Sequence, residues 1–205
     1  EIKNKYKVEH VYYLPHIIDS SEIKKAQNNS DNFIYLGFIG KNKGIEYSLR
    51  LHQQIIKTRP DIQFYVIGKA LGKEVTYHNY LKETYSINVH YLDYVPEEDL
   101  DEIFDKATFS LQLFNNYKFF WPVSGSILNS LKRGKILLTN KVNTIAEIIE
   151  NGKNGFFLSG KLNEDMQLLT QLLNNKTLQN ELSNEAHKNL LQNHSAIIVN
   201  KIFKD

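Results

Sequence analysis

Short apolar runs alternate with segments of helical periodicity along most of the chain, and this alternation limits the fold more than any other feature. The runs cover residues 33–39, 62–67, 89–92 and 108–113. Continuous apolar runs of this length are typical of strands buried on both faces. Between the first two runs, Ile45, Leu49 and Ile55 are spaced as on one face of a helix. The alternation predicts βαβ units with right-handed crossovers, and therefore one doubly wound α/β domain with a parallel sheet.

The remaining segments extend this pattern at both ends. Residues 146–149 predict a short helix, 155–158 a short strand, and 163–203 helices interrupted near 174 and 193. Residues 1–32 hold an extended apolar run broken by Pro15, a short helical segment at 20–26 and a polar stretch. We expect residues 1–32 to be a lead-in segment and residues 33–205 to be a single domain. The chain begins at Glu1 rather than at a methionine, so we expect a fragment of a longer protein.

The charge balance and the absence of cysteine exclude several classes of function. The 25 basic and 23 acidic residues give a net charge of +2, so we expect no nucleic-acid partner. No cysteine is present, which excludes disulfides and thiolate-bound metals. The seven histidines include no His-x-x-x-His pair, and we therefore expect no metal site. No apolar run has the length needed to span a bilayer, and no signal peptide is evident.

A turn of small residues separates the fourth strand from the next predicted helix. Ser124, Gly125 and Ser126 precede a segment of helical periodicity that Gly134 ends, and residues 136–138 form a further apolar run. The free N–H groups and the positive dipole end of a helix starting here would favour a bound phosphate. An ordinary βα turn, in which the serines only cap the helix, is equally consistent with these residues.

The predicted fold also indicates where a ligand would bind. In doubly wound sheets, ligands lie beyond the carboxyl ends of the strands, near the point where the strand order reverses. The chain lacks a Gly-x-Gly-x-x-Gly fingerprint, a Gly-Lys-Ser/Thr phosphate loop and a Gly-x-Ser-x-Gly nucleophile elbow. The acidic residues from Glu97 to Glu102 are interpreted as a helix face and cap rather than as catalytic carboxylates. The turns after the four strands are therefore the candidate sites.

Five segments, taken in order, resemble a known enzyme family. They cover residues 35–44, 65–68, 89–95, 124–139 and 143–157, and residues 13–19 add to them. Together they resemble the carboxyl-terminal, nucleotide-sugar-binding domain of GT-B glycosyltransferases, specifically retaining family four. The resemblance extends from about Tyr12 to the terminal helices. It implies a Rossmann-like half of a two-domain enzyme whose amino-terminal, acceptor-binding domain lies outside this chain.

The resemblance also implies positions that bind the donor. The donor diphosphate would contact Gly40, Lys43, Ser124, Gly125 and Ser126, and the nucleobase would meet the backbone of Tyr94 and Val95. Lys43 matches the family lysine that pairs with the diphosphate; the alternative is a solvated turn lysine. Phe38 stands where many members carry a second cation, an arginine.

The family's Glu-x7-Glu motif is replaced in this chain. Alignment through Gly134 puts Trp121 at the first glutamate and Asn129 at the second. In the family the first glutamate faces the donor sugar and the second binds the ribose hydroxyls. Trp121 and Pro122 would then lie at the donor sugar, where an indole can stack on a sugar face. Asn129 would bind the ribose through uncharged hydrogen bonds.

The resemblance implies the donor-binding domain of a bacterial-type, retaining hexosyltransferase of surface polysaccharide synthesis. We expect no metal or other cofactor, a nucleotide-sugar donor, and a glycan or lipid-linked acceptor held by the missing domain. The isolated fragment is expected to be inactive. The full-length protein is expected to be cytoplasmic, at the inner face of the plasma membrane. Two alternatives stay open: a non-catalytic glycosyltransferase-like module of an enzyme complex, favoured by aromatic residues 117–121, and a nucleotide-sugar epimerase domain.

Overall fold

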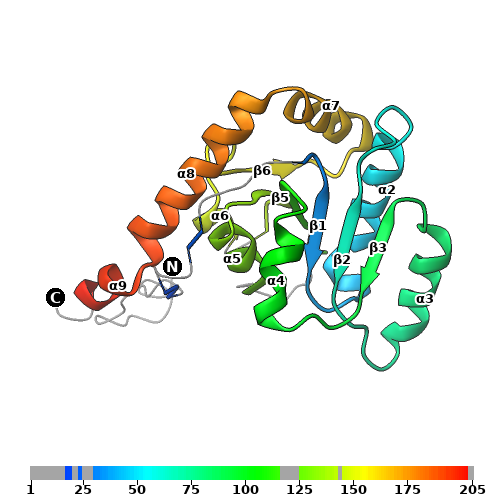
Figure 1. The fold of residues 1–205 in the computed structure, drawn as a ribbon, viewed down its shortest axis with the longest axis horizontal. Coiled ribbons are helices and arrows are strands. Elements are labelled where there is room, and N and C mark those ends of the chain that lie inside the picture. Colours follow the sequence, from blue (N-terminus) through cyan, green and yellow to red (C-terminus); the bar gives the residue numbers. More distant parts are fainter. Residues whose placement is uncertain (1–16, 20–22, 25–29, 116–124, 143–144, 203–205) are drawn as a thin grey trace, which may run out of the picture.

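A six-stranded, all-parallel sheet forms the centre of the molecule (Figure 1). The computed structural model describes residues 17–19, 23–24, 30–115, 125–142 and 145–202. The strands are β1 (Phe33–Leu36), β2 (Phe64–Ile67), β3 (Val89–Leu92), β4 (Phe109–Gln112), β5 (Ile136–Asn140) and β6 (Gly155–Leu158). Their order in the sheet is β3-β2-β1-β4-β5-β6, so the winding direction reverses between β1 and β4. This confirms the predicted doubly wound α/β fold, which is Rossmann-like.

Helices cover both faces of the sheet. They are η2 (Lys41–Lys43), α2 (Ile45–Ile55), α3 (Glu74–Thr84), α4 (Glu97–Phe104), α5 (Gly125–Lys132), α6 (Ile145–Ile148), α7 (Leu162–Leu173), α8 (Lys176–His194) and α9 (Ala196–Ile202). On one face, Phe33, Phe64 and Leu138 pack beneath α2, α3 and α7. On the other face, Ile34 packs beneath α4, and Leu137 packs beneath α5 and α6. Each of these side chains is at most 2% exposed and contributes roughly 1.5–3 kcal/mol through burial.

The long helix α8 joins the two layers. Leu182 belongs to the core under α2 and α7, whereas Ala186 and Leu190 belong to the core under α5 and α6. The helix therefore passes from one face of the sheet to the other beyond its β6 end (Figure 1). The predicted breaks near residues 174 and 193 are confirmed by the gaps between α7, α8 and α9.

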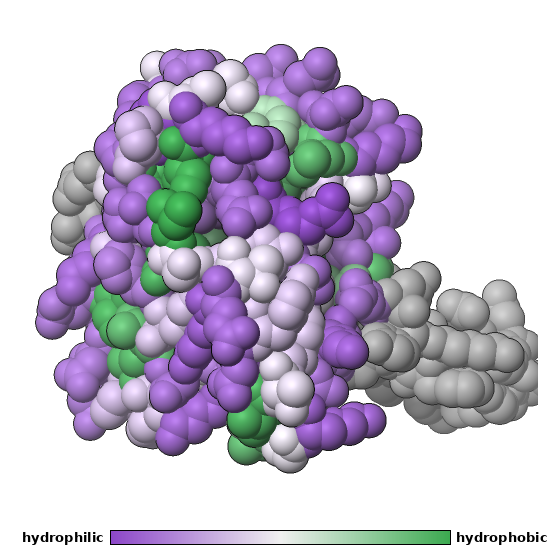
Figure 2. All heavy atoms as spheres, turned by 90° about the vertical axis from the view of Figure 1, so that its right-hand side faces the viewer, coloured by the Kyte–Doolittle hydropathy of each residue, from purple (hydrophilic) through white to green (hydrophobic). Residues whose placement is uncertain are grey.

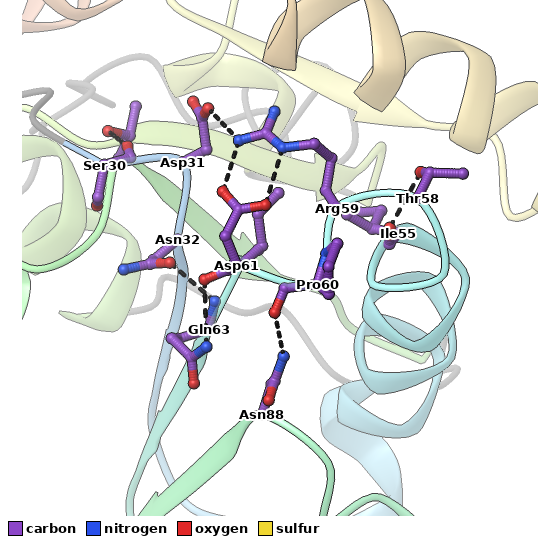
Figure 3. A network of polar contacts seen from close by, with 12 residues as sticks. Ser30, Asp31, Asn32, Ile55, Thr58, Arg59, Pro60, Asp61, Gln63 and Asn88 are labelled. Carbon is purple, nitrogen blue, oxygen red and sulfur yellow. Dashed lines mark hydrogen bonds and ion pairs between the residues drawn. The ribbon is translucent and has the colours of Figure 1, made fainter.

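A polar network closes the edge of the sheet where the strands begin (Figure 3). The Arg59 guanidinium donates to Asp31 at 3.0 Å and to both oxygens of Asp61 at 3.0 and 2.8 Å. Lys176 and Gln179, in the first turn of α8, also donate to Asp31, at 2.6 and 3.2 Å. The network thus connects the loop before β1, the turn before β2 and the start of α8. We refer to this end of the sheet, at which the strands begin, as the amino edge.

The lead-in segment is described only in part. At residues 17–19, the Ile18 N–H donates to the carbonyl of His194 at 2.8 Å, next to the start of α9. The predicted helix over 20–26 lies largely outside the described residues, and the division at residue 32 stays a prediction. Within the described ranges, we find no helix that has both the length and the apolar character of a membrane span.

Candidate functional site

The strands β1 and β4, between which the winding direction reverses, are paired only near their amino ends. β1 and β4 pair only through Phe33 with Phe109 and Ile34 with Ser110, whereas every other neighbouring pair has four matched residues. The carboxyl ends of β1 and β4 therefore diverge beyond these two residue pairs. This is the position at which open α/β sheets bind ligands. We refer to this end of the sheet, at which the strands finish, as the carboxyl edge.

Gln112 bridges the diverging strands. Its side chain is buried, and in the amide orientation that satisfies its hydrogen bonds the oxygen accepts from the Leu36 N–H at 2.8 Å. Its nitrogen then donates to the Leu36 carbonyl at 3.1 Å and to Ser126 Oγ at 3.3 Å. Gln112 thereby connects the end of β1 to the first turn of α5. Gln112 was not among the predicted site residues, although a lone glutamine inside the apolar run 108–113 is visible in the sequence.

Two glycines bring the loops after β1 and β2 into backbone contact. Gly68 has a φ of +144°, and a Cβ added there would lie 1.8 Å from the carbonyl oxygen of Gly37. The Gly37 N–H donates to the Ile67 carbonyl at 2.9 Å. A Cβ at Gly37 would lie 4.0 Å from Ser126 Oγ, so this loop also reaches the start of α5. The close approach requires glycine at position 68.

The loop that carries Lys43 is held against the end of β4. The Lys43 N–H donates to the Gly40 carbonyl at 2.9 Å, which forms the short helix η2. Gly44 then takes a left-handed conformation with a φ of +60°, and a Cβ there would lie 2.8 Å from Cβ of Leu113. The Asn115 N–H donates to the Asn42 carbonyl at 3.0 Å. These contacts fix the position of Lys43 relative to β4.

The Lys43 ammonium lies beside an aromatic ring. Its Nζ is 5.1 Å from the ring centroid of Phe114, within the range of a cation–π contact. The side chain is half-buried, and this desolvation lowers the pKa of Lys43 from the usual lysine value. A partly desolvated cation gains more from a bound anion than a fully hydrated one does. Lys43 is therefore a half-buried lysine beside Phe114 rather than a fully solvated turn lysine.

The helix α5 begins at the carboxyl edge. Gly125 is its first residue and is exposed, and Ser126 follows in the same turn. The described part of the predicted phosphate turn is therefore the amino end of an eight-residue helix. Ser124, Trp121 and Pro122, the other residues predicted here, lie outside the described residues.

Asn129 is held by Gly125, one turn earlier in α5, and by Arg133, which follows the helix. Its amide nitrogen donates to the Gly125 carbonyl at 3.0 Å, and its oxygen accepts from Arg133 at 2.6 Å. Arg133 is itself fixed by Glu97 at 2.9 Å and Asp101 at 2.6 Å. Since the Arg133 side chain is only 5% exposed, it is a structural cation between α4 and α5. Glu97 and Asp101 thus form structural ion pairs, as expected of a helix face, whereas α4 has no side-chain cap, so that part of the prediction was wrong.

Tyr94 and Val95 line a separate hollow of about 570 Å³ that lies between α4 and the strands β2 and β3. Tyr65 and His90 form part of its wall, with ring centroids 5.0 Å apart and nearly parallel planes. Tyr94 is 72% exposed, and its ring centroid lies 5.6 Å from Nζ of Lys69. The structure thus places the predicted nucleobase residues on a different loop from Lys43, on the same edge of the sheet.

Among the described residues, no three His, Asp or Glu side chains gather as metal ligands.

Comparisons with known proteins agree with this geometry. A family model described as "Glycosyl transferases group 1" matches residues 17–189. The C-terminal domain of the group 1 glycosyl transferase LpcC from Francisella tularensis is similar, with 14% identity and a TM-score of 0.74 over 87% of this chain and 99% of that domain. The HepE protein of Anabaena, solved in complex with UDP-glucose, gives 15% identity and a TM-score of 0.77 over 93% of this chain.

The sucrose-phosphate synthase of Thermosynechococcus elongatus gives 13% identity and a TM-score of 0.81 over 99% of this chain. The match covers 54% of the synthase and 56% of HepE, so the chain spans about half the length of these two proteins. A search among curated protein sequences finds no significant match. At these low identities, the structural likeness supports the fold, and the family model supports the kinship.

Proposed function

The chain belongs to the glycosyl transferases group 1 family, and from this we propose that it binds the nucleotide-diphospho-sugar donor of a retaining glycosyltransferase. One observation carries the proposal. Lys43 and the amino end of α5 lie on the two loops that follow β1 and β4, the strands between which the sheet order reverses. A cation and free helix N–H groups at this point are suited to a diphosphate. The UDP-glucose complex of the Anabaena HepE protein supports a donor of this class.

The proposed chemistry depends on stabilising the leaving group. When the bond between the sugar and the diphosphate breaks, negative charge develops on the diphosphate oxygens. The Lys43 ammonium and the N–H groups of Gly125 and Ser126 would stabilise that charge. The sugar would be transferred with retention of configuration and without a metal. We further propose that the donor carries a hexose and that the acceptor is a glycan or a lipid-linked molecule of surface polysaccharide synthesis. The reaction would take place at the inner face of the plasma membrane.

The replaced family residues alter the proposed site. Asn129 would bind the ribose with its remaining N–H, since its oxygen is held by Arg133. The exposed Phe38 leaves Lys43 without the neighbouring arginine cation that other members carry. We therefore expect weaker diphosphate binding than a two-cation site would give. Transfer would further require a second domain to hold the acceptor, and this chain alone is proposed to turn nothing over.

Calorimetric titration of the chain with UDP, GDP and ADP tests the proposal. We expect saturable binding of one nucleotide, weakened about tenfold in Lys43→Ala by the loss of one charge-assisted contact. Lys57→Ala is the matched control, because Lys57 is an exposed lysine just beyond the other end of α2. The proposal fails if no nucleotide binds to the folded chain, or if both variants weaken binding equally.

A second candidate is a non-catalytic module of an enzyme complex. Phe38 is 64% exposed and Leu71 is 62% exposed, and both follow strands at the carboxyl edge. Exposed apolar side chains of this kind occur in protein interfaces. A folded chain that binds none of the three nucleotides would favour this candidate.

A further inference from the structure

A second hollow, separate from the proposed donor site, lies on the outer surface of α2 and α3. Its volume is about 500 Å³, within the range of small-molecule pockets. Its walls are Lys41, Glu46, Lys73, Glu74, Thr76, Tyr77 and Tyr80. None of these side chains has a part in the proposed donor chemistry. The proposed donor site therefore does not account for this hollow.

Two tyrosine rings form an aromatic wall in this hollow. The centroids of Tyr77 and Tyr80 lie 6.4 Å apart, with an angle of 24° between the ring planes. Tyr80 is 46% exposed, so part of its ring surface faces solvent. Lys41 Nζ lies 5.8 Å from the Tyr77 centroid. Nearly parallel, partly exposed tyrosine rings offer a surface on which the C–H face of a pyranose can stack.

A carboxylate stands next to this aromatic wall. The hydroxyls of Tyr77 and Tyr80 donate to the two oxygens of Glu46, at 3.4 and 3.5 Å. Bonds of this length are weak, and a carboxylate has about four acceptor positions. Glu46 therefore keeps the capacity to accept hydrogen bonds from the hydroxyls of a ligand.

The charges and the hydropathy of this surface narrow the class of ligand. Two lysines and two glutamates line the hollow, so it has no net preference for an anion such as phosphate. Figure 2, which faces the side of the molecule where α3 lies, shows a mostly hydrophilic surface with apolar residues in separate small patches. Such a surface does not resemble the continuous apolar patch of a protein interface. Aromatic rings together with equal numbers of basic and acidic side chains suit a neutral polyol such as a sugar.

The hollow also leads toward the candidate site. An adjoining hollow of about 460 Å³ shares Lys41, Glu46 and Tyr77 with it, adds one further cation, Arg50, and extends to Gly44 and Asn115. Gly44 and Asn115 belong to the loops that hold Lys43 against the end of β4. A ligand that occupied both hollows would be longer than one sugar unit, and one of its ends would lie at the rim of the candidate site.

From these observations we infer that the surface of α2 and α3 binds a neutral oligosaccharide, stacked on Tyr80 and hydrogen-bonded to Glu46. This glycan groove is distinct from the donor site, and its binding does not depend on the donor proposal. A role for this groove in transfer, in which it holds the glycan units remote from the transferred sugar, rests on the proposed function.

Titration of the chain with maltohexaose and cellohexaose, followed by NMR, tests this inference. We expect saturable binding of at least one hexasaccharide with a dissociation constant of about 1 mM, a magnitude usual for weak sites. Tyr80→Ala and Glu46→Gln should each weaken that binding about tenfold, because they remove the stacking ring and the acceptor charge. Ile87→Ala and Glu83→Gln, which change exposed residues outside the groove, should bind as the unaltered chain does.

The inference is overturned if neither hexasaccharide binds, if Tyr80→Ala binds as tightly as the unaltered chain, or if tetragalacturonate binds more tightly than both neutral probes. UDP titration of the same samples separates this inference from the donor proposal. Hexasaccharide binding without UDP binding would remove the donor proposal alone, and UDP binding without hexasaccharide binding would remove the glycan groove alone.

Discussion

The two edges of the parallel sheet hold their cations in different ways. At the amino edge, Arg59 forms ion pairs with Asp31 at 3.0 Å and with Asp61 at 2.8 Å (Figure 3). Lys176 also pairs with Asp31, at 2.6 Å. Lys135, at the start of β5, is fully buried and donates to the Ala107 carbonyl at 2.8 Å. Arg59 and Lys176 at this edge therefore join chain segments that are distant in sequence.

At the carboxyl edge, lysines lie over aromatic rings instead. Lys41, Lys43 and Lys69 have their Nζ atoms 5.8, 5.1 and 5.6 Å from the rings of Tyr77, Phe114 and Tyr94. A cation–π contact holds an ammonium through the electrons of the ring. Ion pairs thus join chain segments at the amino edge, and cation–π contacts hold three lysines at the carboxyl edge, where the donor site is proposed.

The largest effect is expected from Gly68, where the carboxyl edge does contribute to stability. A Cβ at this position would lie 1.8 Å from the Gly37 carbonyl oxygen, so Gly68→Ala must displace one of the two loops. We expect a loss of about 3 kcal/mol or more in the free energy of unfolding. Gly72→Ala is the control, because Gly72 has a φ of +55° but no atom within 4 Å of an added Cβ. It should cost about 1 kcal/mol, from backbone strain alone. Urea denaturation measures both, and equal losses would show that the loop contact is unimportant.

Asp31 tests the amino edge. Its side chain is 10% exposed, and Asp31→Ala leaves Arg59 and Lys176 without their shared partner. We expect this change to lower the free energy of unfolding by about 2–3 kcal/mol and to leave nucleotide binding unchanged. Asp61→Ala should cost less than about 1 kcal/mol, because Asp61 is 64% exposed. The two-edge comparison is wrong if Asp31→Ala abolishes nucleotide binding in a chain that remains folded.

Lys135 gives the amino edge a pH dependence. Burial lowers the pKa of Lys135 to about 8, whereas an unfolded chain has an ordinary lysine pKa of about 10.4. Between these values the unfolded state binds more protons, so stability should rise with pH. From pH 7 to about 9.5 we expect a gain of about 2 kcal/mol, which Lys135→Met should lack. Urea denaturation at both pH values measures the free energy of unfolding. An equal gain in the unaltered chain and in Lys135→Met would show that Lys135 does not cause the pH dependence.

Most of the fold could be predicted from the sequence, because strands buried on both faces leave continuous apolar runs. The run 89–92 coincides with β3, and the runs 62–67 and 108–113 differ from β2 and β4 by one or two residues. The run 33–39 was too long, since β1 ends at Leu36, where Gly37 turns the chain with a φ of +147°. An apolar pattern continues through such a turn and does not reveal it.

The candidate site could be predicted less well, because it depends on contacts between distant loops. Lys43 and the start of α5 could be placed by their positions after strands. The bridge by Gln112 could not, since it joins Leu36 to Ser126 only once the sheet has formed. Nor does the sequence around Asn129 show that its oxygen is taken by Arg133.

The carboxyl edge is proposed to bind a nucleoside diphosphate. Chemical-shift mapping of backbone amides during UDP titration tests this most directly. We expect the shifts to gather at Gly37, Lys43, Gly125 and Ser126, while Gln63, Asn88 and Lys135 at the amino edge stay unchanged. Shifts confined to the amino edge, or absent from Lys43 and Gly125 at saturation, would contradict it.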